Sequence, residues 1–325
     1  MAETDRATLL DLWRRMVNIR RFEERVHDLT MAKELEGYTH TAYGEEATAV
    51  GVISLLREDD LFNTTYRNHH HAIARDMPLE AVAAELMGKQ SGVIYGRGGS
   101  MHVADQELGM IGGMGIVAAG LPIAAGAALA FMRQGRDSVV VSFFGDGAVH
   151  QGAWHEALDF AALLAVPVIF FCENNLYAET TAVDYHLNAT SITAMAGPYG
   201  IPAVQVDGMD IFEVRRATER AIDRARSGGG PSLIEAMTYR YGGQYEGDTQ
   251  TYKPPFEVER WRAKDPLDFF RRAVSAHVEA ADLDEIDAQA QRDVDAAWVA
   301  AREADWPSTT DMTADVYTTW PEGAR

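Results

Sequence analysis

The chain has 325 residues, 47% of them hydrophobic, and a formal net charge of −20 at pH 7. This length suits about two domains or one large α/β domain, and we expect a single domain over residues 1–325. The negative charge argues against nucleic acids and anionic membranes as partners, because both need basic patches. The only cysteine, Cys172, excludes an intrachain disulfide. Together with an N-terminus that lacks an apolar signal core, it indicates a cytoplasmic protein.

The first predicted element is an amphipathic helix over residues 6–34, an N-terminal extension in which apolar residues recur at helical spacing from Leu9 to Leu29. A glycine-containing turn then leads into a second helix. His40 comes just before this turn, which would place it at the rim of a pocket, although a lone histidine is more often structural.

A short strand is predicted over Leu61–Tyr66, and it is followed by Arg67-Asn68-His69-His70-His71. If this segment stays extended, Arg67, His69 and His71 share one face. Adjacent histidines then diverge, so we do not expect the histidine run to chelate a metal ion.

Residues 108–132 contain no charged residue, which raises the question of a membrane span. The segment is rich in Gly and Ala and includes Pro122, so it is only weakly hydrophobic. We therefore expect a helix packed closely against another element and no membrane span.

Residues 138–177 contain the central pattern of the chain. A buried strand is predicted over Ser138–Phe144, a helix over Gly152–Leu164, and a second strand over Val168–Cys172. The two strands of such a unit are parallel and are covered by helices. Their carboxyl ends therefore lie on the same edge of the sheet, where ligands bind in this class of fold.

Polar residues follow both of these strands. Asp146 comes directly after the first strand and Asn175 after the second. Carboxylate and amide oxygens suit Mg²⁺, but one carboxylate makes a weak site that phosphate oxygens of a ligand would have to complete. The glycines at 145 and 147 allow a close approach of the backbone, and the following helix start can offer N–H donors to an anion.

The rest of the chain continues the alternation of strands and helices. Strands are predicted over 201–206 and 232–240, and Asp210 with Glu213 forms a capping box for the helix between them. This order predicts a doubly wound parallel sheet with helices on both faces. A C-terminal helical region over 265–325 follows, with helices at 266–279 and 283–303 and a polar tail that either frays or lies on a partner.

The central motif resembles a known cofactor motif. GDG, then 26 residues, then NN is similar to the thiamine diphosphate motif. The fuller pattern GDGAVHQGxxxEAL…PVIFFCENNxY resembles the alpha subunit of the first component of 2-oxo acid dehydrogenase complexes of the pyruvate, acetoin and branched-chain types. A dinucleotide fingerprint fails because His150 stands where its third glycine would be.

The resemblance assigns roles to individual residues. It implies that Asp146, Asn175 and the backbone carbonyl of Tyr177 hold Mg²⁺. The other cofactor contacts that it implies come from Gly145, Gly147 and Ala148 at the diphosphate, from Tyr66 and Arg67, and from Gly115 and Val117 at the aminopyrimidine. It also places His40 near the reacting centre and has His69 and His71 line the channel to it.

The sequence departs from the family pattern at three positions, one of which is Tyr245 in place of the usual serine. His70 replaces the usual glycine of the Tyr-Arg-x-His-x-His segment, and Gln244 replaces a histidine beside the diphosphate that supports transfer to the lipoyl arm. Glutamine can donate and accept hydrogen bonds but cannot carry a proton at neutral pH. Gln244 thus leaves the acyl acceptor open.

The resemblance implies a thiamine diphosphate- and Mg²⁺-dependent enzyme that decarboxylates a 2-oxo acid or cleaves acetoin and passes the acyl unit to a lipoyl-bearing acyltransferase or another acyl carrier. The carboxylate that activates the cofactor comes in this family from a beta subunit, so we expect an α2β2 heterotetramer. An alternative is transfer of a two-carbon unit to a carrier protein or a sugar. A third possibility, a scaffold without activity, is disfavoured by the intact Asp146, Asn175 and Arg67.

Overall fold

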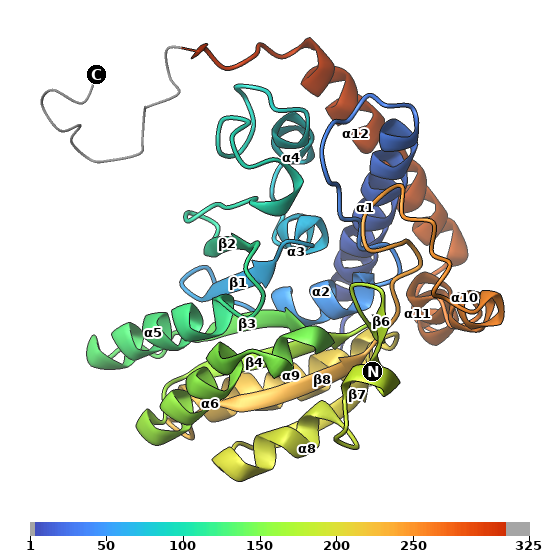
Figure 1. The fold of residues 1–325 in the computed structure, drawn as a ribbon. Coiled ribbons are helices and arrows are strands. Elements are labelled where there is room, and N and C mark those ends of the chain that lie inside the picture. The colour runs from blue at the N-terminus through green and yellow to red at the C-terminus, as the bar shows by residue number, and fades with distance from the viewer. Residues whose placement is uncertain (1–3, 310–325) are drawn as a thin grey trace, which may run out of the picture.

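A six-stranded parallel sheet forms the centre of the computed structural model, which describes residues 4–309 (Figure 1). The strand order is β2-β1-β3-β4-β8-β7, and every neighbouring pair is parallel. The strands are β1 (Leu61–Thr65), β2 (Met110–Met114), β3 (Val140–Gly145), β4 (Val168–Asn174), β7 (Ala203–Asp207) and β8 (Ser232–Met237). The prediction of a doubly wound parallel sheet is confirmed.

The order of the strands reverses between β1 and β3. From β1 the chain first builds β2 on one side, and it then returns to place β3 on the other side of β1. In open α/β sheets the crevice at the carboxyl ends of the strands beside such a reversal binds ligands. The topology therefore points to the segments that follow β1 and β3.

Helices cover both faces of the sheet because alternate strand residues point to opposite sides. Val140 and Phe144 of β3 pack on the side of α5 (Gly120–Arg133), α6 (Gly152–Leu164) and α8 (Ile192–Ala196). Val141 and Phe143 pack on the side of α2 (Glu46–Ile53) and α9 (Ile211–Arg226). Cys172 of β4 is completely buried, and burial raises the pKa of its thiol, which disfavours the reactive thiolate.

A second layer of helices packs outside α2. It consists of α1 (Arg6–Met31), α3 (His69–Ala74), α4 (Leu79–Leu86), α11 (Pro266–Val274) and α12 (Ala280–Glu303). Trp13 stacks on Phe270 with ring centroids 5.6 Å apart, and Phe22 stacks on Trp298 at 5.2 Å. These contacts join the two ends of the chain, which explains why both carry amphipathic patterns.

Asp210 caps α9 as the sequence predicted. Its carboxylate accepts hydrogen bonds from the backbone nitrogens of Phe212 and Glu213, at 2.8 and 3.1 Å. The helix ends at Arg226, two residues before the run Gly228-Gly229-Gly230-Pro231.

Three sequence predictions differ from the structure. The histidine run is helical from His69 to Ala74, so the extended conformation that would put Arg67, His69 and His71 on one face is not formed. Strand β2 lies within residues 108–132, where only a helix was expected, and α10 (Pro255–Arg262) was not predicted at all. The predicted tail over 306–325 lies mostly outside the described residues, which end at 309.

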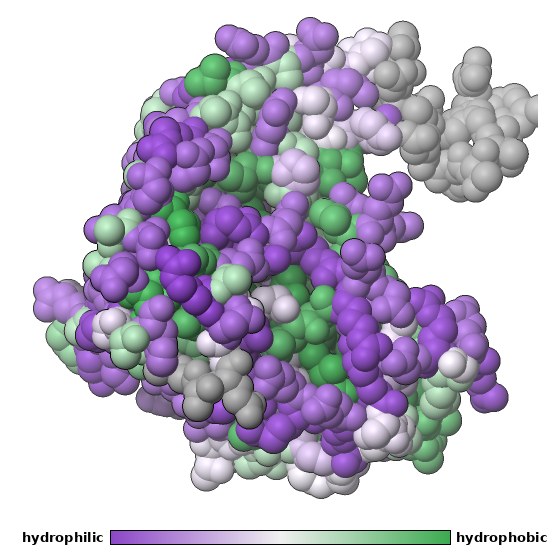
Figure 2. Space-filling view, turned by 180° about the vertical axis from the view of Figure 1, so that it is seen from behind, coloured by the Kyte–Doolittle hydropathy of each residue, from purple (hydrophilic) through white to green (hydrophobic). Residues whose placement is uncertain are grey.

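The described surface is mainly hydrophilic, in keeping with the composition. Seen from the side opposite to Figure 1, hydrophobic side chains show mainly within a hollow near the middle of the face (Figure 2). Within residues 4–309, no helix is both long and apolar enough to cross a membrane.

Candidate active site

A cavity of about 490 Å³ opens at the carboxyl edge of the sheet, where β1 and β3 end. This volume is in the range of small-molecule sites, which is roughly 300–1,000 Å³. The predicted site residues that line it are His40, Tyr66, Arg67, Gly115, Val117, Gly145, Asp146, Gly147, Ala148, Asn175, Tyr177 and Gln244. The structure therefore brings together residues that are up to about two hundred positions apart in the sequence.

Asp146 and Asn175 lie at the ends of neighbouring strands, as the sequence predicted. Asp146 follows β3 and starts a short 3-10 helix over Asp146–His150, and its side chain is almost fully buried. Its Oδ2 accepts a hydrogen bond from Nε2 of His186 at 2.9 Å. Asn175 follows β4 and donates from Nδ2 to Oε1 of Glu45 at 3.1 Å.

The short hairpin of β5 (Tyr177–Ala178) and β6 (Thr181–Ala182) covers the turn after β3. A Cβ atom on Gly147 would lie only 2.7 Å from the Cβ of Ala178, so a larger residue would push this hairpin away. A Cβ on Gly145 would meet nothing within 4 Å, so Gly145 leaves open space next to the cavity. The two glycines thus have different roles in shaping the site.

Gly115 and Val117 border the cavity just after the end of β2. A Cβ on Gly115 would lie 2.9 Å from the ring of His102, which explains the need for glycine there. Val117 is 45% exposed and its neighbour Ile116 is 76% exposed. This rim of the cavity therefore presents apolar side chains to the outside.

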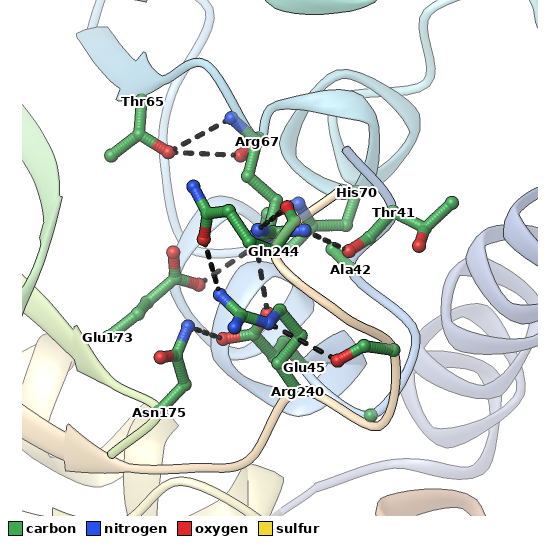
Figure 3. Close-up of polar contacts among 12 residues, drawn as sticks. Thr41, Ala42, Glu45, Thr65, Arg67, His70, Glu173, Asn175, Arg240 and Gln244 are labelled. Carbon is green, nitrogen blue, oxygen red and sulfur yellow. Dashed lines mark hydrogen bonds and ion pairs between the residues drawn. The ribbon is translucent and has the colours of Figure 1, made fainter. Parts of the chain in front are cut away.

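Two buried arginines give the cavity positive charge. Arg67 donates to the carbonyl oxygens of Thr41 and, at 2.8 Å, of Gln244 (Figure 3). Burial is the main cause that lowers the pKa of Arg67, and the charge of the nearby Arg240 is the next. Two cations held this close in a buried site favour an anionic ligand. Sequence reasoning missed Arg240, although the resemblance placed Gln244 of the same segment beside the diphosphate.

The side chain of Gln244 is fully engaged. Its Oε1 accepts from Nη1 of Arg240 at 2.8 Å, and its Nε2 donates to the hydroxyl of Tyr66 at 2.8 Å. Gln244 therefore links the segment after β8 to the segment after β1 across the cavity.

His40 lies at the cavity, as predicted, and its ring packs edge-on against Tyr66 with centroids 4.8 Å apart. Its Nδ1 is buried and has no hydrogen-bond partner among the described residues. Burial, with a further effect from the Arg67 charge, lowers the pKa of His40 to about 3. The ring is thus neutral at physiological pH and can offer hydrogen bonds to a ligand.

His69 and His71 do not line the cavity, and both are completely buried. Nδ1 of His69 lies 3.1 Å from Oε2 of Glu23, and its Nε2 lies 2.9 Å from Oγ of Ser100. The same Ser100 oxygen accepts from the backbone nitrogen of His40 at 3.2 Å. His69 therefore contacts the cavity wall only through Ser100.

His70 and His71 meet at Glu173, which does line the cavity. The two rings are 3.8 Å apart, and each Nε2 lies within 3.4 Å of Oε1 of Glu173. The expectation that adjacent histidines diverge is thus wrong here, because the backbone is helical. Thr48 also donates to Glu173 at 2.6 Å. Nδ1 of His70 and Nε2 of His71 are buried and make no hydrogen bond to any described residue, and the ligand atoms of His70, His71 and Glu173 lie within 4.8 Å of one another.

These contacts affect the ionisation of neighbouring groups. Burial raises the pKa of the Glu173 carboxyl, but His71 and His70 outweigh it and hold that pKa far below its usual range. Burial and the charge of Glu173 raise the pKa of Glu45 to about 7. Burial lowers the pKa of His70 to about 4, and His71 adds to this effect.

Glu45 is a cavity residue that sequence reasoning missed. The sequence offers two acids in a row before α2, and their spacing does not show which one faces the cavity. In the structure Glu46 pairs with Arg20 at 2.6 Å, away from the cavity, and Glu45 takes the place beside Asn175.

The glycine loop over residues 96–102 is held by one buried carboxylate. Glu85 of α4 accepts hydrogen bonds from four backbone nitrogens, those of Ile94, Gly96, Gly98 and Gly99, at 2.8 to 3.1 Å. The loop in turn positions Ser100 between His69 and His40. The glycine loop is therefore held in place, and its Met101 lines the cavity.

Comparison with known proteins agrees with the resemblance in the motifs. A family model described as the dehydrogenase E1 component matches residues 14–309. The chain is 42% identical over 313 residues to the alpha subunit of acetoin:2,6-dichlorophenolindophenol oxidoreductase of Bacillus subtilis, across 96% of this chain and 94% of the relative. The protein of the same name from Cupriavidus necator is 43% identical over 319 residues, across 97% and 96%. The pyruvate dehydrogenase E1 component subunit alpha of Zymomonas mobilis is 38% identical over 315 residues, across 96% and 89%.

Proposed function

The chain belongs to the dehydrogenase E1 component family, and on that premise we propose that it is the alpha subunit of a thiamine diphosphate-dependent dehydrogenase. Its donor is acetoin or a 2-oxo acid such as pyruvate, and the acyl unit passes to a lipoyl-bearing acyltransferase or another carrier. The observation that carries the proposal is the placement of Asp146 and Asn175 at the ends of two neighbouring parallel strands, on a cavity that also contains Arg67 and Arg240.

The residues present fit a magnesium diphosphate. Mg²⁺ would be held by the Asp146 carboxylate, the Asn175 amide oxygen and the Tyr177 carbonyl, which are all hard oxygen donors. Arg67 and Arg240 would balance the remaining phosphate charge. The open space at Gly145 and the backbone of Gly147 and Ala148 border the same region of the cavity.

Bound thiamine diphosphate supplies the nucleophilic carbon that attacks the donor's carbonyl group. The chain's own residues bind and orient. Gly115 and Val117 would hold the aminopyrimidine end through backbone groups, and Tyr66 would contact the cofactor beside Arg67. The neutral His40 would then hydrogen-bond to the carbonyl oxygen of the donor at the open side of the cavity.

We place His69 and His71 in supporting roles. His69 would act on the site through Ser100, which contacts it and the His40 backbone. His71 would act through Glu173. Gln244 would hold the side chains of Tyr66 and Arg240 in position and would not transfer a proton.

We further propose that the chain forms one diphosphate-binding domain and works in the cytoplasm as an α2β2 heterotetramer. The names of the relatives as alpha subunits support a beta subunit as the partner. The exposed Ile116 and Val117 at the cavity rim also support it, because a second chain there would cover both side chains and close the site.

The alternative reaction, transfer of a two-carbon unit to a carrier protein or a sugar, was suggested only by Gln244. Since the side chain of Gln244 is used to join Tyr66 and Arg240, its presence does not by itself indicate a different acceptor.

The test is dye-linked turnover. The chain is co-expressed with its candidate beta subunit, loaded with Mg²⁺ and thiamine diphosphate, and supplied with acetoin, pyruvate and branched-chain 2-oxo acids. We expect one donor to reduce 2,6-dichlorophenolindophenol, and we expect the reduction to need both subunits. Bound cofactor with no turnover of any donor would refute the dehydrogenase and favour a non-oxidative transferase.

A further inference from the structure

Each of the two side chains that would bind Mg²⁺ is held by another side chain from a distant segment. His186 at the end of α7 (Val183–His186) contacts Asp146, and Glu45 just before α2 contacts Asn175. Figure 3 shows the side chains of Glu45 and Asn175 pointing toward each other. The strand ends alone therefore do not set the orientation of either ligand.

We propose that Glu45 and His186 are positioning residues of the metal site, which turn the oxygens of Asn175 and Asp146 toward the cation before it binds. This inference rests on the proposed function, because it takes Asp146 and Asn175 as the ligands of Mg²⁺.

Glu45 acts by selecting one end of the Asn175 amide. An amide can present its nitrogen or its oxygen to a site, and only the oxygen binds a cation. An ionised carboxylate only accepts hydrogen bonds, so Glu45 holds the nitrogen, at 3.1 Å. The amide oxygen then accepts only a long bond, at 3.4 Å, from the backbone nitrogen of Tyr177 and keeps a lone pair for the cation.

A purely structural role explains Glu45 less well. Its second oxygen, Oε2, is buried and makes no hydrogen bond to any described residue, and its nearest cation, the Nε of Arg67, is 4.0 Å away. Burying a carboxylate with one unsatisfied oxygen costs stability. Such a cost is expected where the group serves a ligand.

His186 acts on the carboxylate in the same way. Its Nε2 donates to Oδ2 of Asp146 at 2.9 Å, and its Nδ1 lies 3.0 Å from Nε2 of His150, which fixes the orientation of the ring. With Oδ2 held, Oδ1 is the oxygen turned to the cation. Such outer contacts typically change metal affinity by about 10–100-fold when they are removed.

The experiment measures the affinity of the site for Mn²⁺, which is used as a probe in place of Mg²⁺. The full chain with its candidate beta subunit is titrated with Mn²⁺ in excess thiamine diphosphate at pH 8, and free Mn²⁺ is read by electron paramagnetic resonance. We expect Glu45→Ala and His186→Ala to weaken Mn²⁺ binding by about 10–100-fold. Glu45→Gln can donate as well as accept, so it no longer selects the nitrogen of Asn175 and should lose part of the affinity. His186→Gln keeps a donor for Asp146 and should retain most of the affinity.

The matched control is His155→Ala. His155 also contacts a single polar side chain, the hydroxyl of Tyr199 at 2.6 Å, but it lies outside the cavity lining. This variant should bind Mn²⁺ like the wild type. In the two alanine variants of the proposed residues, the KM for Mg²⁺ should rise while kcat at saturating Mg²⁺ changes little.

The outcomes separate this inference from the proposed function. If the wild type binds no Mn²⁺ with thiamine diphosphate, both fail. If the wild type binds Mn²⁺ and the alanine variants bind it equally well, the inference alone fails. A lower melting temperature with unchanged Mn²⁺ affinity would show a structural role and would also overturn it. Should an alanine variant not fold, the glutamine variants decide: unchanged binding in Glu45→Gln, or a loss of about 10-fold or more in His186→Gln, would contradict the inference.

Discussion

The Nε2 atom of Gln244 lies 2.8 Å from the hydroxyl oxygen of Tyr66, and the other end of the same amide lies 2.8 Å from Nη1 of Arg240. One neutral side chain thus connects an aromatic residue after β1 to a cation after β8. At this position the family pattern has a histidine. A histidine that is protonated on both ring nitrogens is positively charged and only donates hydrogen bonds, so it could not accept one from Arg240.

We expect Gln244→Leu to destabilise the protein. Leucine has nearly the same size as glutamine, but it removes the buried oxygen that accepts a hydrogen bond from Arg240. A hydrogen bond to a charged group contributes about 1.5–3 kcal/mol, and the free energy of unfolding should fall by roughly this amount. Urea unfolding measures it. Gln244→Glu still offers an acceptor to Arg240 and should lose less. Equal stability of Gln244→Leu and wild type would show that the bridge contributes nothing.

We expect Gln244→His to give no gain in acylation of a lipoyl domain, because the wild-type glutamine already holds Tyr66 and Arg240 in place. The measurement is acyl transfer from the preferred donor to a free lipoyl domain, compared at saturating cofactor. A clear gain would instead mean that the missing histidine limits transfer to a lipoyl domain in this protein. It would favour the alternative acceptor, a carrier protein or a sugar.

We expect Asp146→Ala to lose donor-dependent dye reduction while the fold remains, since the change removes the only carboxylate among the proposed Mg²⁺ ligands. Mg²⁺ with thiamine diphosphate at about 100 times Kd should stabilise the wild type by about 2.7 kcal/mol. The variant should show no such stabilisation in thermal unfolding. Full activity in the variant would refute the metal assignment.

The site residues that could be predicted are those whose position follows from the residues next to them in the sequence. Asp146 and Asn175 could be placed because a strand end can be read from the apolar run before it, and parallel strands bring their ends together. Glu45, Glu173 and Arg240 were not found as cavity residues, although the predicted site residues His40, Asn175 and Gln244 lie in the same three segments. The sequence does not show which other side chains of a segment face the cavity.

The fold predictions failed where local patterns mislead. Strand β2, Met110–Met114, contains two glycines and no valine, so its propensity does not indicate a strand, and it forms because it pairs with β1. The run His69–His71 was considered as a possible extended segment, but it starts α3, where tertiary packing buries all three rings. Strands β3 and β4 were predicted well because they are long apolar runs in the middle of the sheet.

We expect Glu85→Ala to loosen the glycine loop, because four backbone N–H groups lose their shared acceptor. Hydrogen exchange in residues 94–102 should become faster, and the KM for thiamine diphosphate should rise as Ser100 and His40 lose their fixed positions. The matched control is Glu80→Ala on the same helix, where the side chain is exposed. Unchanged exchange in the loop would show that its conformation does not depend on Glu85.

Lys253 should make stability depend on pH. The side chain is only 6% exposed, and its amine donates to the carbonyl oxygens of Arg240 and Gly242 at 2.6 and 2.5 Å. Burial lowers its pKa from 10.5 to about 7, and the charges of Arg240 and Arg67 add to this effect. A neutral amine still has two hydrogens for the two carbonyls, so deprotonation keeps both contacts.

The direction of the effect follows from proton binding. Between about pH 7 and pH 10.5 the unfolded chain keeps the Lys253 proton and the folded chain releases it. Stability from this group therefore rises with pH across this window and is lost as the pH falls through 7. We expect the free energy of unfolding of the wild type, relative to Lys253→Met, to increase from pH 7 to pH 9 in urea titrations. Lys264→Met, which changes an exposed lysine, should show no such trend. A flat difference for Lys253 would mean that its two carbonyl contacts keep the amine protonated in the folded protein.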